Sequence, residues 1–251
     1  MLNEKWNSAL YDQKHSFVYE YGKDLLALLH PQPGETILDV GCGTGHLTAQ
    51  IAAAGARITG LDSSAAMIEK AQAAYPNLEF IQADATNFSF PEPFDAVFSN
   101  ATLHWISDAE AAVKCMAQAL KSGGRLVVEF GGKNNIANIM NALGAALTEL
   151  GIAGMSRAMY FPSIGEYATW LEKYGLEIKQ AFLFDRPTKL DGEDGMKNWL
   201  RMFAVMKTEN LSEELRETTF ALAEKKLRSV QYIDGQWYAD YRRLRIVAHK
   251  L

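Results

Sequence analysis

The strongest constraint on the fold is a glycine-rich turn that directly follows a short apolar segment. Residues 35–46 read Glu-Thr-Ile-Leu-Asp-Val-Gly-Cys-Gly-Thr-Gly-His. The apolar residues Ile37, Leu38 and Val40 are typical of a buried parallel strand, and we expect a helix over residues 46–54. The glycines let the backbone turn tightly and approach a ligand, because no Cβ atom stands in the way. The segment therefore predicts a strand, a turn and a helix that bind a nucleotide-like ligand. The alternative is a tight turn that binds nothing.

A turn of this kind suits dinucleotides as well as S-adenosylmethionine, and spacing and charge distinguish the two. The dinucleotide fingerprint needs glycine at the first, third and sixth places of the turn. Here Gly41 and Gly43 fill the first and third places, but the sixth is His46 and Gly45 is fifth. Asp39, two residues before the turn, would repel a pyrophosphate but attract an ammonium or sulfonium group. Both observations favour S-adenosylmethionine.

The motif Asp-Val-Gly-Cys-Gly-Thr-Gly, residues 39–45, resembles the first motif of the class I S-adenosylmethionine-dependent methyltransferases. The resemblance covers residues 31–132, where we expect further strands at 57–62, 78–84, 94–100 and 125–130. It implies an α/β, Rossmann-like, doubly wound sheet of seven strands. The last strand would run antiparallel between the fifth and the sixth.

Asp62 ends the second expected strand and is a candidate ligand of the cofactor ribose. It follows Gly41 by 62 − 41 = 21 residues, close to the spacing of about 20 at which an acidic residue binds ribose hydroxyls. Asp62 could instead cap the next helix, a role that Ser63 or Ser64 would fill as well. We favour ribose binding.

The resemblance extends these assignments along the edge of the sheet where the strands end. It implies that Asp84 accepts the adenine amino group beside Ala85, that the backbone at Asn100 and Ala101 holds the methionine ammonium group, and that His104 and Trp105 face the reacting methyl group. The predicted cofactor-binding residues are Asp39, Gly41, Cys42, Gly43, Gly45, Asp62, Ser63, Met67, Asp84, Ala85, Asn100 and Ala101.

Composition limits the class of protein. The chain has 251 residues, 48% of them hydrophobic, a net charge of −5 and two cysteines, so it can bury one substantial core. The sequence has no run of about 18 apolar residues and no signal-like start, and the two cysteines lack metal-ligand spacing. We therefore expect a cytoplasmic protein without a metal. Because basic residues are not clustered, we expect small-molecule substrates rather than nucleic acid or membrane partners.

The domain organisation follows from the same pattern. We expect an N-terminal helical lid over residues 1–30 and the S-adenosylmethionine-binding core over 31–132. The remainder of the sheet would lie at about 163–184 and 244–250. Insertions at about 133–162 and 186–240 would form a helical cap, the second with helices at 196–206 and 211–226.

Motifs outside the core look like the small-molecule branch that contains the trans-aconitate methyltransferases. They are Trp6-Asn, Asp185-Arg-Pro, Asn198-Trp199 and Asp240-Tyr-Arg-Arg-Leu-Arg. This resemblance implies a small carboxylic acid or a similar metabolite as the methyl acceptor. The predicted lid and substrate residues are Tyr11, His15, Tyr160, Arg186 and Trp199. For the aromatic residues the alternative is ordinary packing.

The acceptor decides which catalytic groups are needed. A carboxylate is already ionised near neutral pH, so it needs a cation for orientation but no base. A phenol, amine or carbon acceptor would benefit from a base. His104 is the best-placed base in the motif, and the alternative is that it only forms the pocket wall. The candidate cations are Arg157, Arg186, Arg201, Arg242 and Arg243.

Four functions remain open at this point. We favour a methyltransferase acting on a small metabolite, for example O-methylation of a carboxylic acid. A methyltransferase acting on a macromolecule should show a basic groove. An aminopropyl transferase should carry an acidic pair after the fourth strand, where this chain has Asn-Ala-Thr-Leu-His at residues 100–104. A non-catalytic protein would bind S-adenosylmethionine without releasing a methylated product. The sequence does not indicate an oligomeric state.

Overall fold

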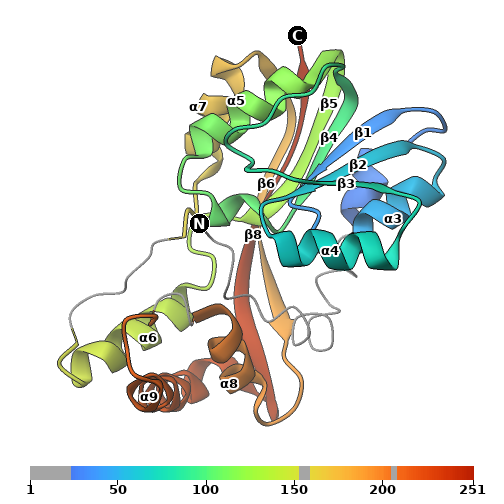
Figure 1. Cartoon of the computed structure of the whole chain (residues 1–251). Helices are drawn as coiled ribbons and strands as arrows, with labels where there is room; N and C mark the ends of the chain where they lie inside the picture. Colours follow the sequence, from blue (N-terminus) through green and yellow to red (C-terminus); the bar gives the residue numbers. More distant parts are fainter. Residues whose placement is uncertain (1–23, 153–158, 205–207) are drawn as a thin grey trace.

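The structure is a computed structural model that describes residues 24–152, 159–204 and 208–251 (Figure 1). The strands are β1 (Thr36–Val40), β2 (Arg57–Asp62), β3 (Glu79–Gln82), β4 (Phe94–Asn100), β5 (Leu120–Gly131), β6 (Leu176–Lys189), β7 (Tyr232–Ile233) and β8 (Gln236–Lys250). Seven of them form one path in the order β3-β2-β1-β4-β5-β8-β6, and β7 pairs with β8. The first five strands are parallel, and β8 runs antiparallel between β5 and β6. The predicted sheet is confirmed.

Helices connect the strands and form the cap. They are α3 (His46–Ala53), α4 (Ala65–Ala74), the 3-10 turn η1 (Leu103–Trp105), α5 (Ala109–Ala119), α6 (Ala137–Glu149), α7 (Ile164–Lys173), α8 (Gly195–Trp199), the π-helical η2 (Leu200–Ala204) and α9 (Glu213–Gln231). Residues 24–29 are also helical. The alternation of helices with parallel strands in the first half makes this a doubly wound fold.

Two helical layers cover the sheet because successive strand residues point to opposite faces. On β1, Ile37 contributes to the core shared with α3, whereas Leu38 belongs to the core shared with α5 and α7. The first of these cores also contains Leu25 and Leu29 from the helical segment at 24–29. The carboxyl ends of the parallel strands are left at one edge of the sheet, which is where ligands bind in folds of this type.

The last two long strands form a ribbon that continues beyond the sheet (Figure 1). Their pairing runs from Leu176 opposite Lys250 to Lys189 opposite Tyr238. Residues 186–189 and 236–240 therefore belong to strands, although we expected them in a cap insertion. The burial of Trp237, Ala239 and Tyr241 on β8 alternates with more exposed neighbours. This is a strand period, and it extends the sheet toward the cap.

The cap packs around the far end of this ribbon. Its core joins Leu143 of α6, Trp199 of α8, Phe220 and Leu227 of α9, and Trp237 of β8. These residues belong to a further hydrophobic cluster, separate from the two that flank the sheet. The observed helices lie close to the predicted ones, although α9 ends later, at Gln231.

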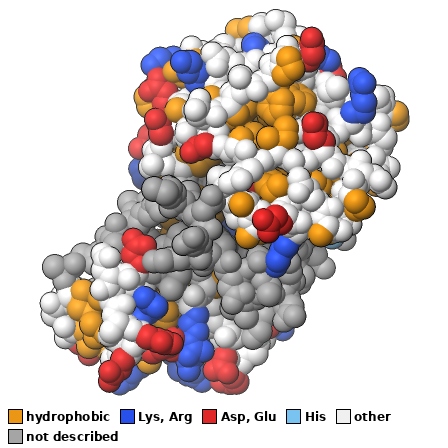
Figure 2. Space-filling model, viewed as in Figure 1, with side chains coloured by type: hydrophobic (Ala, Val, Ile, Leu, Met, Phe, Trp, Pro, Cys, Tyr) orange, Lys and Arg blue, Asp and Glu red, His pale blue; other side chains and the backbone are white. Residues whose placement is uncertain are grey.

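The surface is mixed in charge. Figure 2 shows acidic and basic side chains interspersed on the visible face of both the sheet region and the cap. Among the residues that the structure describes, no helix is long and apolar enough to cross a membrane.

Candidate active site

The glycine turn after β1 is held in place by β2. The backbone N–H groups of Gly41 and Cys42 both donate to the carbonyl of Leu61, at 2.6 and 3.0 Å. Gly41, Gly43 and Gly45 all have positive φ, at 78°, 56° and 82°. This is the left-handed region that favours glycine.

The three glycines are needed for different reasons. A Cβ atom on Gly41 would overlap the side chain of Thr102, and one on Gly45 would lie 2.7 Å from the ring of Phe80. A Cβ atom on Gly43 would meet nothing within 4 Å. Gly41 and Gly45 therefore allow close packing, whereas the backbone of Gly43 faces open space that a ligand can occupy.

The carboxylate of Asp62 lies directly beside this turn. One of its oxygens accepts the backbone N–H of Gly43 at 3.0 Å, and the other accepts that of Ser64 at 2.9 Å. Burial raises the pKa of Asp62, and its backbone hydrogen bonds partly offset this effect. Each carboxylate oxygen can accept a second hydrogen bond, so this carboxylate can also bind a diol. The cap of α4 is Ser64, whose Oγ accepts the N–H of Met67 at 3.4 Å.

Asp39 is buried beneath the turn, where its side chain accepts a hydrogen bond from the hydroxyl of Thr48 at 2.7 Å. Burial, assisted by the charge of Asp62, raises its pKa to about 7. Burial also raises the pKa of the neighbouring Cys42 thiol, as do the two carboxylates. A thiol with a raised pKa is a poor nucleophile, so this turn is not suited to covalent catalysis by Cys42.

The end of β4 meets the same turn. Ala101 has a positive φ of 56°, unusual for a residue with a side chain, and its N–H donates to the carbonyl of Glu129 at 2.7 Å. The hydroxyl of Thr102 donates to the carbonyls of Gly41 and Asn100, both at 3.1 Å. The structure therefore brings the segment from 100 to 102 against the glycine turn.

The predicted adenine site lies at the end of the neighbouring strand β3. Asp84 is exposed, and one of its oxygens accepts the N–H and the hydroxyl of Thr86, both at 2.8 Å. Ala85 is buried, and Ser63 is half-buried. These residues share the carboxyl edge of the sheet with Asp62 because β2 and β3 are parallel neighbours.

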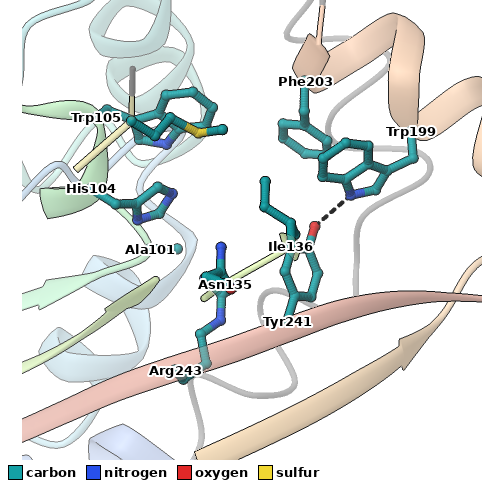
Figure 3. Close-up of a pocket in the computed structure, with 10 residues that line it drawn as sticks. Ala101, His104, Trp105, Asn135, Ile136, Trp199, Phe203, Tyr241 and Arg243 are labelled. Atoms are coloured by element: carbon teal, nitrogen blue, oxygen red, sulfur yellow. Dashed lines mark hydrogen bonds between the residues drawn. The ribbon is translucent and has the colours of Figure 1, made fainter. Parts of the chain in front are cut away.

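A pocket opens where the sheet meets the cap, and Ala101 connects it to the turn. It encloses about 470 Å³, part of which is open to solvent. Figure 3 shows His104 and Ala101 on the side of the sheet, Trp199 and Phe203 on the side of the cap, and Tyr241 and Arg243 rising from β8 between them. The lining residues are Ala101, His104, Trp105, Asn135, Ile136, Met159, Trp199, Phe203, Tyr241 and Arg243.

His104 is a buried wall residue with a defined orientation. Its Nδ1 accepts the backbone N–H of Gly131 at 3.3 Å, and the side chain is only 6% exposed. Burial lowers its pKa well below the usual 6.5, and the nearby positive charge of Arg243 lowers it further. A neutral imidazole that accepts through Nδ1 carries its proton on Nε2. His104 therefore acts as a hydrogen-bond donor through its second nitrogen.

The structure separates the five candidate arginines. Arg243 lines the pocket, is 7% exposed, and lies with its guanidinium 4.4 Å from the ring centre of Tyr241. Arg201 forms an ion pair with Glu217, and Nε of Arg242 lies 3.4 Å from a carboxylate oxygen of Asp185. Arg157 falls outside the described residues.

Arg186 does not line the pocket. It forms an ion pair with the carboxylate of Glu129, which also accepts a hydrogen bond from Nε of Arg245 at 2.7 Å. Glu129 is 3% exposed, so one buried carboxylate holds two guanidinium groups. We name this group the Glu129 cluster.

The predicted aromatic residues are distributed between the pocket and the core. Trp105 and Trp199 line the pocket, and the indole N–H of Trp199 donates to the hydroxyl of Tyr241 at 2.7 Å. Tyr160 packs against the core beside α7, and its backbone N–H donates to the carbonyl of His104 at 3.0 Å. Tyr11 and His15 lie outside the described residues.

Sequence reasoning missed five pocket residues: Asn135, Ile136, Met159, Phe203 and Tyr241. Asn135 is fixed by its side-chain oxygen, which accepts the N–H of Arg242 at 2.8 Å. Ile136 has a positive φ of 53°, which is strained for a β-branched residue. Like Ala101, it shows the local strain that clusters at functional sites. No group of three His, Cys, Asp or Glu side chains within the described ranges could hold a metal ion.

Known proteins resemble this chain in sequence and in fold. Residues 37–124 match a methyltransferase-domain family. The chain is 31% identical to an uncharacterized methyltransferase of Schizosaccharomyces pombe, over the full length of both proteins. It is 32% identical to a trans-aconitate 2-methyltransferase of Deinococcus radiodurans, over 80% of this chain and 81% of that protein.

A solved structure gives the same fold. The TehB-like S-adenosylmethionine-dependent methyltransferase of Corynebacterium glutamicum superimposes with a TM-score of 0.56 over 97% of this chain and 98% of that one, at 18% identity. The same family is indicated by the glycine turn, by the acidic residues at the strand ends and by the relative that matches over its full length. The chain belongs to the class I S-adenosylmethionine-dependent methyltransferases.

Proposed function

We propose that this enzyme methylates a carboxylate oxygen of a small organic acid bound in the pocket beside Ala101. The observation that carries the proposal is the position of Arg243, a buried cation in the pocket wall. A guanidinium group matches the planar geometry of a carboxylate. The similarity to a trans-aconitate 2-methyltransferase supports an acid as the acceptor.

The cofactor would lie along the carboxyl edge of β1 to β4. Gly43 offers bare backbone, Asp62 would accept the ribose hydroxyls, and Asp84 with Ala85 would bind the adenine. Asp39 is buried under the turn and would attract the positive charge through space in its ionised form, which burial restricts to pH values above about 7. When bound, S-adenosylmethionine supplies an electrophilic methyl group on a positively charged sulfur.

The residues of the pocket orient the acceptor and exclude water. Arg243 would bind the carboxylate, and Nε2–H of His104 would donate a hydrogen bond to it. Arg243 and His104 would hold a carboxylate oxygen in line with the methyl group that the cofactor would supply, so that a lone pair on this oxygen would form the new bond and the electron pair of the broken carbon–sulfur bond would stay on sulfur. No proton moves, so a base is unnecessary. Much of the rate can come from holding the two reactants in line.

The orientation of His104 disfavours acceptors that need a base. Its Nδ1 is occupied by the N–H of Gly131, and its other nitrogen carries the proton. A phenol, amine or carbon acceptor would find a donor there rather than a base. The interspersed charges in Figure 2 support a small substrate over a nucleic acid. The two free cysteines support a cytoplasmic location.

The proposal is tested by release of S-adenosylhomocysteine with a panel of carboxylic acids, phenols and amines. We expect turnover with an acid, and a product that hydrolyses in base, as an ester does. Replacing Arg243 by Gln should lower kcat/KM for the acid by about 100-fold, as expected for the loss of a buried charge contact.

A matched control and a binding measurement complete the test. Arg201→Gln removes an exposed cap arginine that pairs with Glu217 and should leave kcat/KM nearly unchanged. Calorimetry should show that Arg243→Gln still binds S-adenosylmethionine. Turnover of phenols or amines but not of acids would contradict the proposal.

A further inference from the structure

The pocket has one polar end and one aromatic end, and this division restricts the acceptor beyond its carboxylate. The polar end is formed by His104, Asn135 and Arg243 near Ala101. The opposite end is formed by Trp199 and Phe203 from the cap (Figure 3). An acceptor whose carboxylate lies near Ala101 therefore has its remaining atoms among aromatic rings.

The indole N–H at the aromatic end has its partner within the pocket wall. The indole N–H of Trp199 donates to the hydroxyl of Tyr241, and both side chains are buried. The ring of Trp199 also lies 5.2 Å from that of Phe203. What this end presents to a ligand is mainly apolar ring surface, which favours hydrocarbon and aromatic groups.

Among the described lining residues, positive charge lies at the polar end. Arg243 is the one Lys or Arg among the described lining residues. The neighbouring arginines are engaged with acidic partners: Arg186 with Glu129, Arg201 with Glu217 and Arg242 with Asp185. Among the described residues of the aromatic end, a second carboxylate on the acceptor would be buried against apolar rings without a cation, and burying an unpaired charge is costly.

We infer that the acceptor is a monocarboxylic acid with an apolar body, and that acids with two or three carboxylates are poor substrates. This inference rests on the proposed function and deepens it. The inferred acceptor differs from trans-aconitate, a tricarboxylate, for which one relative of this chain is named.

The test compares acids that differ in one carboxylate. Hexanoate and hexanedioate share a chain length, and 3-phenylpropanoate adds a ring, while trans-aconitate represents the tricarboxylates. We expect kcat/KM to be about 10- to 100-fold higher for hexanoate than for hexanedioate. The value for 3-phenylpropanoate should exceed that for hexanoate, because the aromatic end can pack against a ring.

A pair of variants at the aromatic end adds a second readout. Phe203→Lys introduces a cation there and should raise kcat/KM for hexanedioate relative to hexanoate. Phe203→Leu keeps the end apolar and should leave that ratio unchanged. Binding of S-adenosylmethionine, measured by calorimetry, shows that each variant is folded.

The outcomes separate the inference from the proposed function. If trans-aconitate or hexanedioate is the better substrate and its turnover depends on Arg243, the inference is wrong and the proposed function stands. If no acid is methylated although the enzyme binds S-adenosylmethionine, the proposed function is wrong and the inference falls with it. If the enzyme prefers the apolar monoacids and Phe203→Lys shifts this preference toward the diacid, the result supports both the proposed function and the inference.

Discussion

Nδ1 of His104 accepts a hydrogen bond from the backbone N–H of Gly131, 3.3 Å away. Gly131 ends β5, and a Cβ atom there would lie 2.7 Å from the side-chain nitrogen of Asn135. The glycine therefore lets Asn135 approach the end of the strand beside His104. The bond fixes the orientation of the imidazole and the nitrogen that carries its proton.

We expect His104 to remain neutral at and below pH 7, because burial and Arg243 lower its pKa. The unfolded chain binds a proton at this residue below about pH 6.5 and the folded chain does not, so His104 makes the fold less stable as the pH falls below 6.5. His104→Gln should reduce this acid sensitivity, measured as the free energy of unfolding at pH 7 and pH 5. The ring signals of His104 in NMR spectra should not titrate between those values. Titration near 6.5 would show that the imidazole is solvated.

Asp39→Asn is expected to stabilise the cofactor-free protein and to weaken the binding of S-adenosylmethionine. The folded state holds a proton on Asp39 up to about pH 7, whereas the unfolded state loses it near 3.8. Asp39 therefore reduces stability as the pH rises between these values. The variant should gain on the order of a few kcal/mol at pH 8, and the gain should vanish toward pH 4. At pH 8, where Asp39 is ionised, the substitution should lower the affinity for the cofactor by roughly 10-fold because the attracting charge is lost.

Asp95→Asn is the matched control for that variant. Asp95 lies near the start of β4, at the opposite end of the sheet. Its carboxylate accepts hydrogen bonds from the ammonium group of Lys121 and from the N–H and hydroxyl of Thr36, and these bonds lower its pKa to about 2. Its ionised form stabilises the fold above pH 3.8, and this contribution is lost as the pH falls toward 2. The substitution should lower stability at neutral pH and leave cofactor affinity unchanged. If both variants lost the same affinity for S-adenosylmethionine, Asp39 would have no specific role in binding the cofactor.

Alanine substitutions should distinguish the glycines of the turn. Gly43→Ala places a Cβ atom in open space, so it should cost only about 1–2 kcal/mol of stability for the positive φ. Its affinity for S-adenosylmethionine should fall more than its stability suggests, because the methyl group enters the ligand space. Gly41→Ala should destabilise the protein more strongly, since its Cβ atom overlaps Thr102. Calorimetry and thermal melting of both variants measure the two effects, and normal binding by Gly43→Ala would exclude the turn as the site.

The Glu129 cluster should be essential for stability. Glu129→Gln leaves two guanidinium groups without their buried carboxylate, and breaking a buried pair in this way costs about 3–5 kcal/mol. Glu217→Gln breaks the exposed pair with Arg201 and should cost less than about 1 kcal/mol. Denaturant unfolding of the two variants tests the difference, and similar values would show that the cluster is hydrated.

The cofactor edge was predictable from sequence because its signals are local. The glycines at 41, 43 and 45 and the acid at 62 lie within short segments whose strands pair in parallel. The doubly wound sheet and the antiparallel last strand between the fifth and the sixth followed from the family resemblance, and the structure confirms both. The roles of these residues toward the cofactor stay predictions.

The pocket was less predictable because it depends on contacts between distant segments. Asn135 and Arg242 are 107 residues apart, and His104 and Gly131 are 27 apart. Tyr241 and Arg243 reach the pocket because β8 is longer than expected. The alternating burial of Trp237, Ala239 and Tyr241 follows a strand period, which could have indicated the longer strand.

The ribbon of β6 and β8 has a consequence for how such enzymes diversify. Its sheet end completes the scaffold beside β5, and its far end supports the cap core through Trp237. Under the proposed function, the aromatic end of the pocket would therefore be carried by the far part of a continuous hairpin and its helices, whereas Arg243 lies where β8 still pairs with β5. The residues beside the donor would follow the first four strands. Evolution can exchange the outer half of this hairpin with its helices and create a new specificity, and the machinery that handles the donor stays intact.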